Sequence, residues 1–165
     1  YKPLLSELID SVENYIKVNK LKPIKYNIET KSSPEGDNIL QHEPQEFVGL
    51  LMEVLKAKKI LKRTTIQSFD KRTIQVLNQQ NRKLSLSYLI SANNKSTPAE
   101  LVASLGFRPA IISPEYRLVT AAYLEACHKE KMKVIVWTVN EKDQIEKMKE
   151  LGVDGIISDY PDRFK

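Results

Sequence analysis

Length, composition and charge place the chain among ordinary globular proteins. It has 165 residues, of which 41% are hydrophobic and 28% charged, and this balance excludes a disordered or collagen-like chain. The net charge of +5 comes from positive and negative residues mixed along the chain, so we expect no nucleic-acid partner. No apolar run approaches the roughly 20 residues of a transmembrane segment. We expect a single domain over residues 1–165.

Apolar periodicity predicts helices and strands that alternate along the chain. Apolar residues at spacings of three and four predict a first helix, and five similar patterns follow. The predicted helices cover residues 4–18, 44–59, 70–79, 97–105, 117–131 and 141–151. Short β-branched runs predict strands over residues 24–30, 63–69, 84–90, 109–114, 132–139 and 153–159. Asp70 and Thr97 are expected to begin the helices that follow them.

This alternation indicates an α/β fold with a parallel sheet. The strands recur roughly every 20 to 40 residues, which fits either a doubly wound open sheet or part of an eight-stranded (β/α) barrel. The first helix has no strand before it, and a whole barrel usually takes about 250 residues. We therefore predict a (β/α) barrel of the TIM type that lacks its first two βα units in this chain, an incomplete barrel over residues 1–165.

The stretch KYNIETK, residues 25–31, has one polar face. The strand period of two puts Lys25, Asn27, Glu29 and Lys31 on that face. In a sheet covered on both sides an isolated carboxylate is costly, so Glu29 needs a cation, a metal or an amine beside it. Two interpretations stay open, namely a strand end whose charges pair with one another and a metal or phosphate site.

The stretch VIVWTVN, residues 134–140, ends an apolar strand with the only tryptophan of the chain. Trp137 is interpreted either as a core residue or as a flat apolar wall for a ligand, and Asn140 as the cap of the next helix. The stretch LGVDGIISDYPD, residues 151–162, is by itself typical of turns and helix starts.

Taken in order, four motifs resemble those of the glycerophosphodiester phosphodiesterase family. NIETK is similar to the family's Asn-Ile-Glu-x-Lys strand, IQSFD to its Ser-Phe-Asp segment, WTVN to its Trp-Thr-Val-Asn segment, and GVDGIISDYPD to its closing motif. The resemblance runs over essentially the whole chain. It implies a (β/α) barrel enzyme that hydrolyses glycerophosphodiesters to glycerol 3-phosphate and an alcohol, with a divalent cation, Ca²⁺ or Mg²⁺.

The resemblance also implies roles for four residues. Glu29 matches the family's third metal carboxylate, and Lys31 matches the amine that stabilises the substrate phosphate. Trp137 matches the aromatic residue on the glycerol side, and Phe69 of the Ser-Phe-Asp segment is the second expected substrate-binding residue. The expected partner is a small glycerophosphodiester, and the resemblance favours a periplasmic or secreted location over a cytoplasmic one.

The family's catalytic histidines lie in a His-Arg-Gly motif on the first strand and a His-Asp motif after the second, in a region that also holds two further metal carboxylates. None of these motifs occurs in the sequence. His42 and His128 stand in other contexts, and we interpret both as structural or surface residues. We therefore expect these 165 residues alone to hydrolyse nothing and to hold a metal ion weakly through Glu29.

Two other functions compete with the phosphodiesterase. One is a non-catalytic α/β module that binds an anionic partner, which the missing histidines support. The other is a different barrel enzyme of phosphorylated metabolites, such as an isomerase or an aldolase. A phosphate site at a helix N-terminus in the last two loops would favour it, but Asp159 and Asp162 there would repel phosphate.

Overall fold

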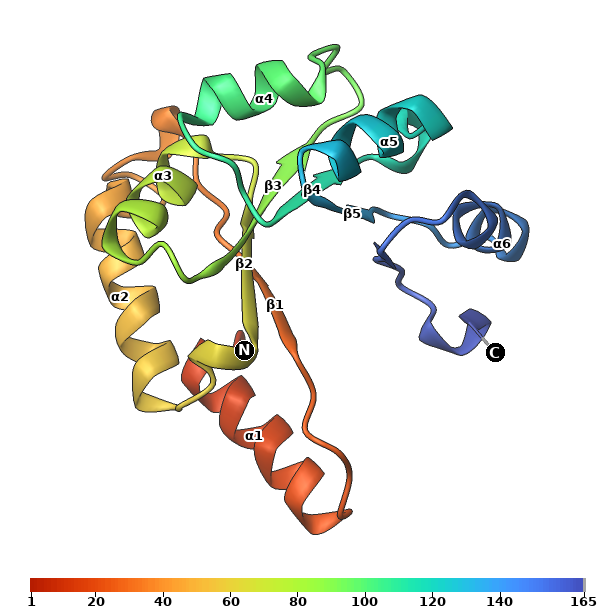
Figure 1. Ribbon diagram of the computed structural model, residues 1–165. Helices are drawn as coiled ribbons and strands as arrows, with labels where there is room; N and C mark the ends of the chain where they lie inside the picture. Colours follow the sequence, from red (N-terminus) through yellow and green to blue (C-terminus); the bar gives the residue numbers. More distant parts are fainter. Residues whose placement is uncertain (165) are drawn as a thin grey trace.

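The computed structural model describes residues 1–164, which form a curled sheet of six parallel strands with helices on its outer side (Figure 1). The strands are β1 (Tyr26–Glu29), β2 (Thr64–Ser68), β3 (Ser85–Ile90), β4 (Ile111–Pro114), β5 (Lys133–Val136) and β6 (Gly155–Ile156). The helices are α1 (Leu5–Val18), α2 (Pro44–Ala57), α3 (Lys71–Gln80), α4 (Pro98–Leu105), α5 (Ala121–Lys129) and α6 (Lys142–Leu151). Within residues 1–164, none of these helices combines the length and the apolar character needed to cross a bilayer.

The order of the strands in the sheet follows the order of the chain, from β1 to β6. A doubly wound sheet reverses its strand order at a switch point, whereas a barrel adds each new strand on the same side of the last one. The structure therefore decides between the two predicted α/β folds, and it shows a six-stranded half-barrel of the TIM type. Within residues 1–164, strands β1 and β6 each pair with one neighbouring strand, and the absence of two preceding units stays a prediction.

The helix starts follow the capping residues closely. Asp70 accepts a hydrogen bond from the backbone N–H of Arg72 (3.0 Å), and Thr97 accepts one from Glu100 (3.3 Å), as predicted. The predicted start of the helix over residues 117–131 was wrong. It begins at Ala121 after a 3₁₀ turn, because Thr120 provides the cap there.

The two faces of the sheet have different compositions. Outward-facing residues such as Ile66 and Ile112 are buried in two apolar clusters against the helices. On the inner face polar side chains bond across strands, as Asn27 Nδ2 donates to Gln67 Oε1 (2.8 Å). This arrangement leaves the concave side polar, with hydrogen bonds between side chains of neighbouring strands.

Asp154 joins α5 to β5 at the amino end of the sheet. Its Oδ2 accepts a hydrogen bond from the backbone N–H of Val134 (2.8 Å) and lies 2.8 Å from His128 Nε2. Burial alone would raise the pKa of Asp154, but the hydrogen bonds from Val134 and His128 outweigh it and lower the pKa. His128 therefore lies at the edge opposite to the carboxyl ends of the strands.

We expect Asp154 to contribute to the loss of stability in acid. Because its folded pKa lies below the unfolded value of about 3.9, its contribution is present above that pH and is lost as the pH falls through the lowered value. The melting temperature of Asp154→Asn should fall less steeply than that of the wild type between about pH 5 and pH 3. Asp143→Asn, at an exposed position of α6, should follow the wild type. Parallel curves for Asp154→Asn and the wild type would contradict this expectation.

Candidate active site

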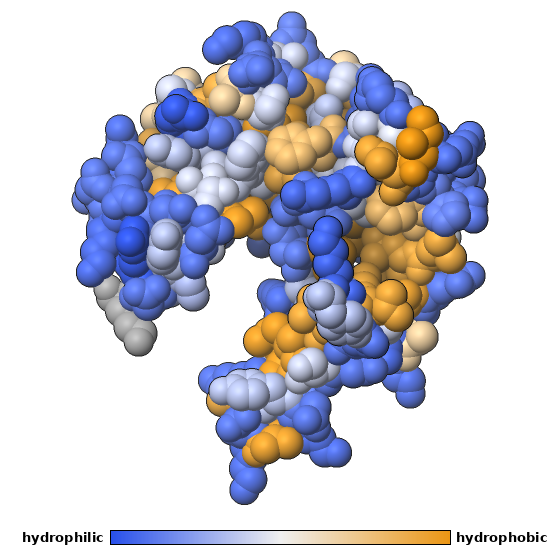
Figure 2. All heavy atoms as spheres, turned by 180° about the vertical axis from the view of Figure 1, so that it is seen from behind, coloured by the Kyte–Doolittle hydropathy of each residue, from blue (hydrophilic) through white to orange (hydrophobic). Residues whose placement is uncertain are grey.

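The side chains singled out from the sequence lie where strands end. Glu29 is the last residue of β1, Phe69 follows β2 and Trp137 follows β5. Because the strands are parallel, their carboxyl ends share one edge of the sheet, which we call the carboxyl edge, and barrel enzymes bind their substrates at this edge. Figure 2 shows that the molecule is hollowed between α1 and the C-terminal end, so that the concave side is open to solvent.

Glu29 is a half-buried carboxylate without a partner among residues 1–164, within which it makes no hydrogen bond or ion pair. Its neighbour across the sheet is Gln67 on β2, whose side-chain oxygen already accepts a hydrogen bond from Asn27. The described residues contain no group of three or more histidine, cysteine or acidic side chains that could hold a metal ion. Glu29 thus presents a single carboxylate ligand.

Lys31 is exposed in the loop that follows β1. It lies at the rim of a mostly apolar groove of about 550 Å³ between α1 and α2, which His42 and Leu50 also line. No ion pair joins Lys31 to Glu29 in the part of the chain that the structure describes. The interpretation of a strand end with mutually paired charges is therefore wrong for these two residues.

Phe69 and Trp137 meet across the concave side of the sheet. Their ring centroids are 5.3 Å apart and the rings are nearly perpendicular, at 89°. Trp137 Nε1 donates a hydrogen bond to the carbonyl oxygen of Ser113 (2.7 Å), which fixes the indole, while 45% of Phe69 remains exposed. Because β2 and β5 are not neighbours, only the curl of the sheet brings these rings together.

Glu115 lies at the same edge and was missed by sequence reasoning. It follows β4, is only 6% exposed, and accepts hydrogen bonds from Arg117 Nε (2.8 Å) and the Arg117 backbone N–H (3.0 Å). Backbone hydrogen bonds link its neighbours to Trp137, since Tyr116 N–H donates to the Trp137 carbonyl oxygen (3.0 Å). An acidic residue directly after the predicted strand 109–114 was the available signal.

The prediction that Asn140 caps α6 is wrong, because Glu141 occupies the cap position. Its side chain instead bridges the loops that follow β5 and β6. Asn140 Nδ2 donates to Asp159 Oδ2 (2.9 Å), and its Oδ1 accepts hydrogen bonds from Ser158 Oγ (3.1 Å) and the Asp159 backbone N–H (3.0 Å). The prediction was wrong because this contact depends on two loops that are distant in the sequence.

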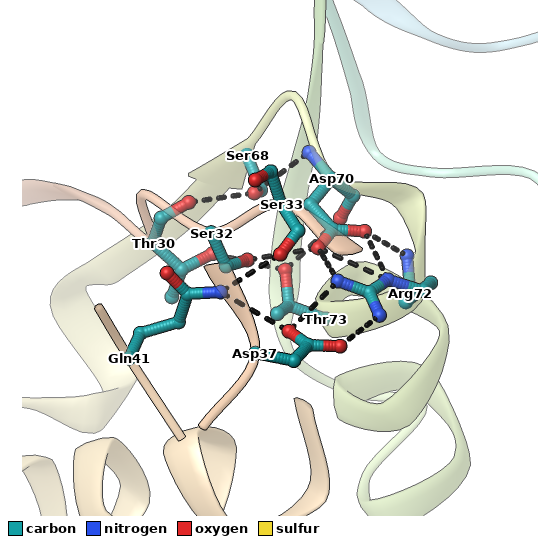
Figure 3. A network of polar contacts seen from close by, with 9 residues as sticks. All are labelled: Thr30, Ser32, Ser33, Asp37, Gln41, Ser68, Asp70, Arg72 and Thr73. Atoms are coloured by element: carbon teal, nitrogen blue, oxygen red, sulfur yellow. Dashed lines mark hydrogen bonds and ion pairs between the residues drawn. The ribbon is translucent and has the colours of Figure 1, made fainter. Parts of the chain in front are cut away.

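A network of polar side chains joins the loop after β1 to the loop after β2 and the start of α3 (Figure 3). Arg72 bonds to Asp70 and to Asp37, and these two contacts raise the pKa of its guanidinium. Arg72 in turn lowers the pKa of Asp37. For Asp70, burial would raise the pKa, but the hydrogen bonds from Arg72 outweigh burial and lower it. All three groups are therefore charged at neutral pH.

The sequence matches the family model described as "Glycerophosphoryl diester phosphodiesterase family" over residues 2–163. A glycerophosphodiester phosphodiesterase of Caldanaerobacter subterraneus subsp. tengcongensis is 39% identical over 51 residues, which are 31% of this chain and 21% of that protein. A second, of Bacillus altitudinis, is 44% identical over 45 residues, 27% of this chain and 18% of that protein.

Solved structures agree with this match. A candidate glycerophosphoryl diester phosphodiesterase from Silicibacter pomeroyi DSS-3 has a TM-score of 0.77 and 28% identity, with 98% of this chain and 54% of that one covered. A phosphodiesterase from Oleispira antarctica, in complex with the product sn-glycerol-3-phosphate, shares the fold with a TM-score of 0.74 and 20% identity, over 96% of this chain and 58% of that one. This chain thus spans a little over half the length of these relatives. Since the family match covers nearly all of its residues, the chain belongs to the glycerophosphoryl diester phosphodiesterase family.

Proposed function

We propose that this chain forms the phosphate- and glycerol-binding side of an enzyme that hydrolyses glycerophosphodiesters to glycerol 3-phosphate and an alcohol. The observation that carries the proposal is the grouping of an unpartnered carboxylate, Glu29, with the Phe69–Trp137 pair at the carboxyl edge. Membership of the family supports the reaction class. The product bound to the Oleispira antarctica phosphodiesterase supports the substrate class. By the same family likeness we propose a periplasmic or secreted location.

A divalent cation, Ca²⁺ or Mg²⁺, suits the ligand that Glu29 offers. Both ions prefer oxygen ligands, and Mg²⁺ is often held by one or two carboxylates while it keeps several waters and shares the phosphate oxygens of the substrate. Glu29, half-buried and without a partner in residues 1–164, would supply the carboxylate. When bound, such a cation neutralises charge that develops on the phosphoryl oxygens.

Lys31 and the aromatic pair would bind the rest of the substrate. The Lys31 ammonium is exposed beside the carboxyl edge, where it adds a positive charge for the phosphate oxygens. The edge-to-face rings of Phe69 and Trp137 offer an apolar surface against which the glycerol carbons can lie, away from water. Each group thus binds a different part of the phosphodiester.

Hydrolysis also needs proton transfers. The water gives up a proton to a general base as its oxygen forms a bond to phosphorus. The bond from phosphorus to the alcohol oxygen breaks, and that oxygen takes a proton from a general acid, so both groups must lie within hydrogen-bond reach. Of the two histidines, His128 lies at the amino end beside Asp154, and His42 lies 3.2 Å from Glu46 next to the groove. The residues described at the edge would therefore serve binding and charge stabilisation.

A binding module for anionic partners remains the second candidate. The observation in its favour is that, within residues 1–164, His128 lies beside Asp154 at the amino end and His42 lies beside Glu46 of α2. Such a binding module would differ from a phosphodiesterase in which ligand it prefers. A phosphodiesterase site should prefer glycerol 3-phosphate to inorganic phosphate because of the aromatic wall, whereas a general anion site should not.

Titration with sn-glycerol 3-phosphate by calorimetry tests the proposed function. We expect binding in Mg²⁺ or Ca²⁺ that weakens at least about fivefold when the metal is removed with EDTA, because the cation links the phosphate to Glu29. Glu29→Gln should bind equally weakly with and without metal. Glu53→Gln, at an exposed position of α2, should behave like the wild type. An affinity for sn-glycerol 3-phosphate that is the same with and without the metal, or no binding at all, would contradict the proposal.

A further inference from the structure

We propose that Arg72, in the first turn of α3, is a positioning residue that holds Lys31 and Phe69 at the carboxyl edge by joining the loop after β1 to the loop after β2. The inference rests on the proposed function for the role of Lys31 in phosphate binding. The contacts that hold the two loops together stand on their own. We call Arg72, Asp70 and Asp37 together the Arg72 clamp.

The guanidinium of Arg72 bonds to two carboxylates from different loops. Its Nη1 and Nη2 lie 2.5 Å and 3.2 Å from the two carboxylate oxygens of Asp37. Its Nε and Nη2 lie 3.0 Å and 2.7 Å from the oxygens of Asp70. Because the five donors of arginine lie in one plane, two bidentate contacts fix the relative position of both partners (Figure 3).

The clamp is partly shielded from water. The Asp70 side chain is only 5% exposed, and those of Arg72 and Asp37 are largely covered as well. Exposed ion pairs contribute little because water and salt screen them, whereas a partly buried pair with several hydrogen bonds is screened much less. The clamp is therefore a defined contact between the two loops, unlike the exposed ion pair between Lys149 and Glu146 on α6.

Further hydrogen bonds extend the clamp along the loop after β1. Ser32 Oγ donates to Asp70 Oδ2 (2.9 Å), and Gln41 Nε2 donates to the Ser33 carbonyl oxygen (2.8 Å) and to Asp37 Oδ1 (3.1 Å). The Gln41 side chain lies over Gly36, where an added Cβ would come within 2.4 Å of Gln41 Oε1. Residues 32–41 are thus held to one another and to the start of α3.

The proposed ligand-binding residues Lys31 and Phe69 each lie, along the chain, between two members of this network. Thr30 and Ser32 both bond into it, since Thr30 Oγ1 lies 3.0 Å from Thr73 Oγ1 and Ser32 Oγ donates to Asp70, while Lys31 between them is exposed. Phe69 likewise lies in the sequence between Ser68, whose Oγ donates to the Thr30 carbonyl oxygen (2.7 Å), and Asp70. The backbone of Lys31 and that of Phe69 are therefore anchored on both sides by contacts within the network.

An anchored charge binds a phosphate better than a mobile one. A group that is held in place before binding loses less conformational freedom when the ligand arrives. The loop between β1 and α2 contains the short turn Pro34–Gly36 and backbone hydrogen bonds among residues 33–41, which hold it locally. The side-chain contacts from Arg72 and Asp70 are what tie this loop to the start of α3. Without the bond from Arg72 to Asp37, Lys31 should move more and bind phosphate less tightly.

Asp37→Asn tests the inference, because it weakens the contact to the loop and leaves Arg72, Asp70 and the cap of α3 intact. We expect amide hydrogen exchange of residues 31–41 to become at least about tenfold faster while that of α3 stays unchanged. The affinity for sn-glycerol 3-phosphate in Mg²⁺ should fall at least about threefold. Glu146→Gln, which removes the exposed ion pair with Lys149 (2.7 Å), serves as the matched control and should change neither quantity.

A double-mutant cycle with Lys31→Met shows whether Arg72 acts through Lys31. If it does, Asp37→Asn should cost no further affinity once Lys31 is methionine. An equal loss in both backgrounds would overturn the inference, and so would faster exchange throughout α3 and β2, which indicates general destabilisation. Selective loosening of residues 31–41 in a protein that binds no sn-glycerol 3-phosphate would instead contradict the proposed function and leave the Arg72 clamp in place.

Discussion

Replacing Ile112 with alanine is expected to lower the free energy of unfolding by about 3–4 kcal/mol. Ile112 lies in β4, is 0% exposed, and belongs to the apolar cluster that joins β4 and β5 to α5 and α6. The substitution removes buried apolar surface and leaves a cavity that close-packed neighbours fill only in part. Since a domain of this kind is stable by only about 5–15 kcal/mol, the loss is a large fraction of the total.

Urea denaturation at neutral pH measures this effect through the transition midpoint, at an unchanged dependence on denaturant. Ile39→Ala is the matched control, because the Ile39 side chain is 79% exposed in the loop after β1. It should change the free energy of unfolding by less than about 0.5 kcal/mol. A loss for Ile112→Ala as small as that for Ile39→Ala would contradict the burial of Ile112 in this cluster.

Replacing Lys31 with methionine is expected to weaken the binding of sn-glycerol 3-phosphate by about tenfold or more. Methionine keeps an unbranched, flexible side chain but removes the ammonium, and a hydrogen bond to a charged group contributes about 1.5–3 kcal/mol. A loss of about 1.4 kcal/mol corresponds to a tenfold change in affinity. Calorimetry in Mg²⁺ at low salt measures the effect, which should shrink as salt screens the exposed charge.

Lys25→Met is the control for Lys31→Met. Lys25 is also exposed, but it lies before β1 at the opposite end of the strand. It should leave the affinity for sn-glycerol 3-phosphate unchanged. Equal losses in the two variants would mean that the chain attracts anions through its general positive charge, as a binding module for anionic partners would.

The helices and strands followed from local features of the sequence. The β-branched runs and the three-and-four spacing of apolar residues predicted all six strands and six helices, and Asp70 and Thr97 marked two helix starts correctly. These features depend on neighbours within a turn or two, so they can be read without the fold. The start of α5 was misplaced because the 3₁₀ turn before it carries helix-compatible residues.

The candidate site was predicted in part. Residues that end strands, such as Glu29 and Trp137, could be placed at one edge because parallel strands end together. Glu115 and Arg72 were not singled out, since what they contact was not visible in the sequence. Whether Glu29 binds a metal and Lys31 a phosphate stays a prediction, which the titrations above address.

The sequence by itself determined the alternation of strands and helices, the polar face around Glu29 and the family motifs, because each depends on residues close together in the chain. Only the tertiary structure decided the sequential strand order, the meeting of Phe69 with Trp137, and the clamp from Arg72 to Asp37. The physical reason is the same in each case. These contacts form when the curled parallel sheet brings distant segments together. Local propensity does not determine which distant segments come into contact.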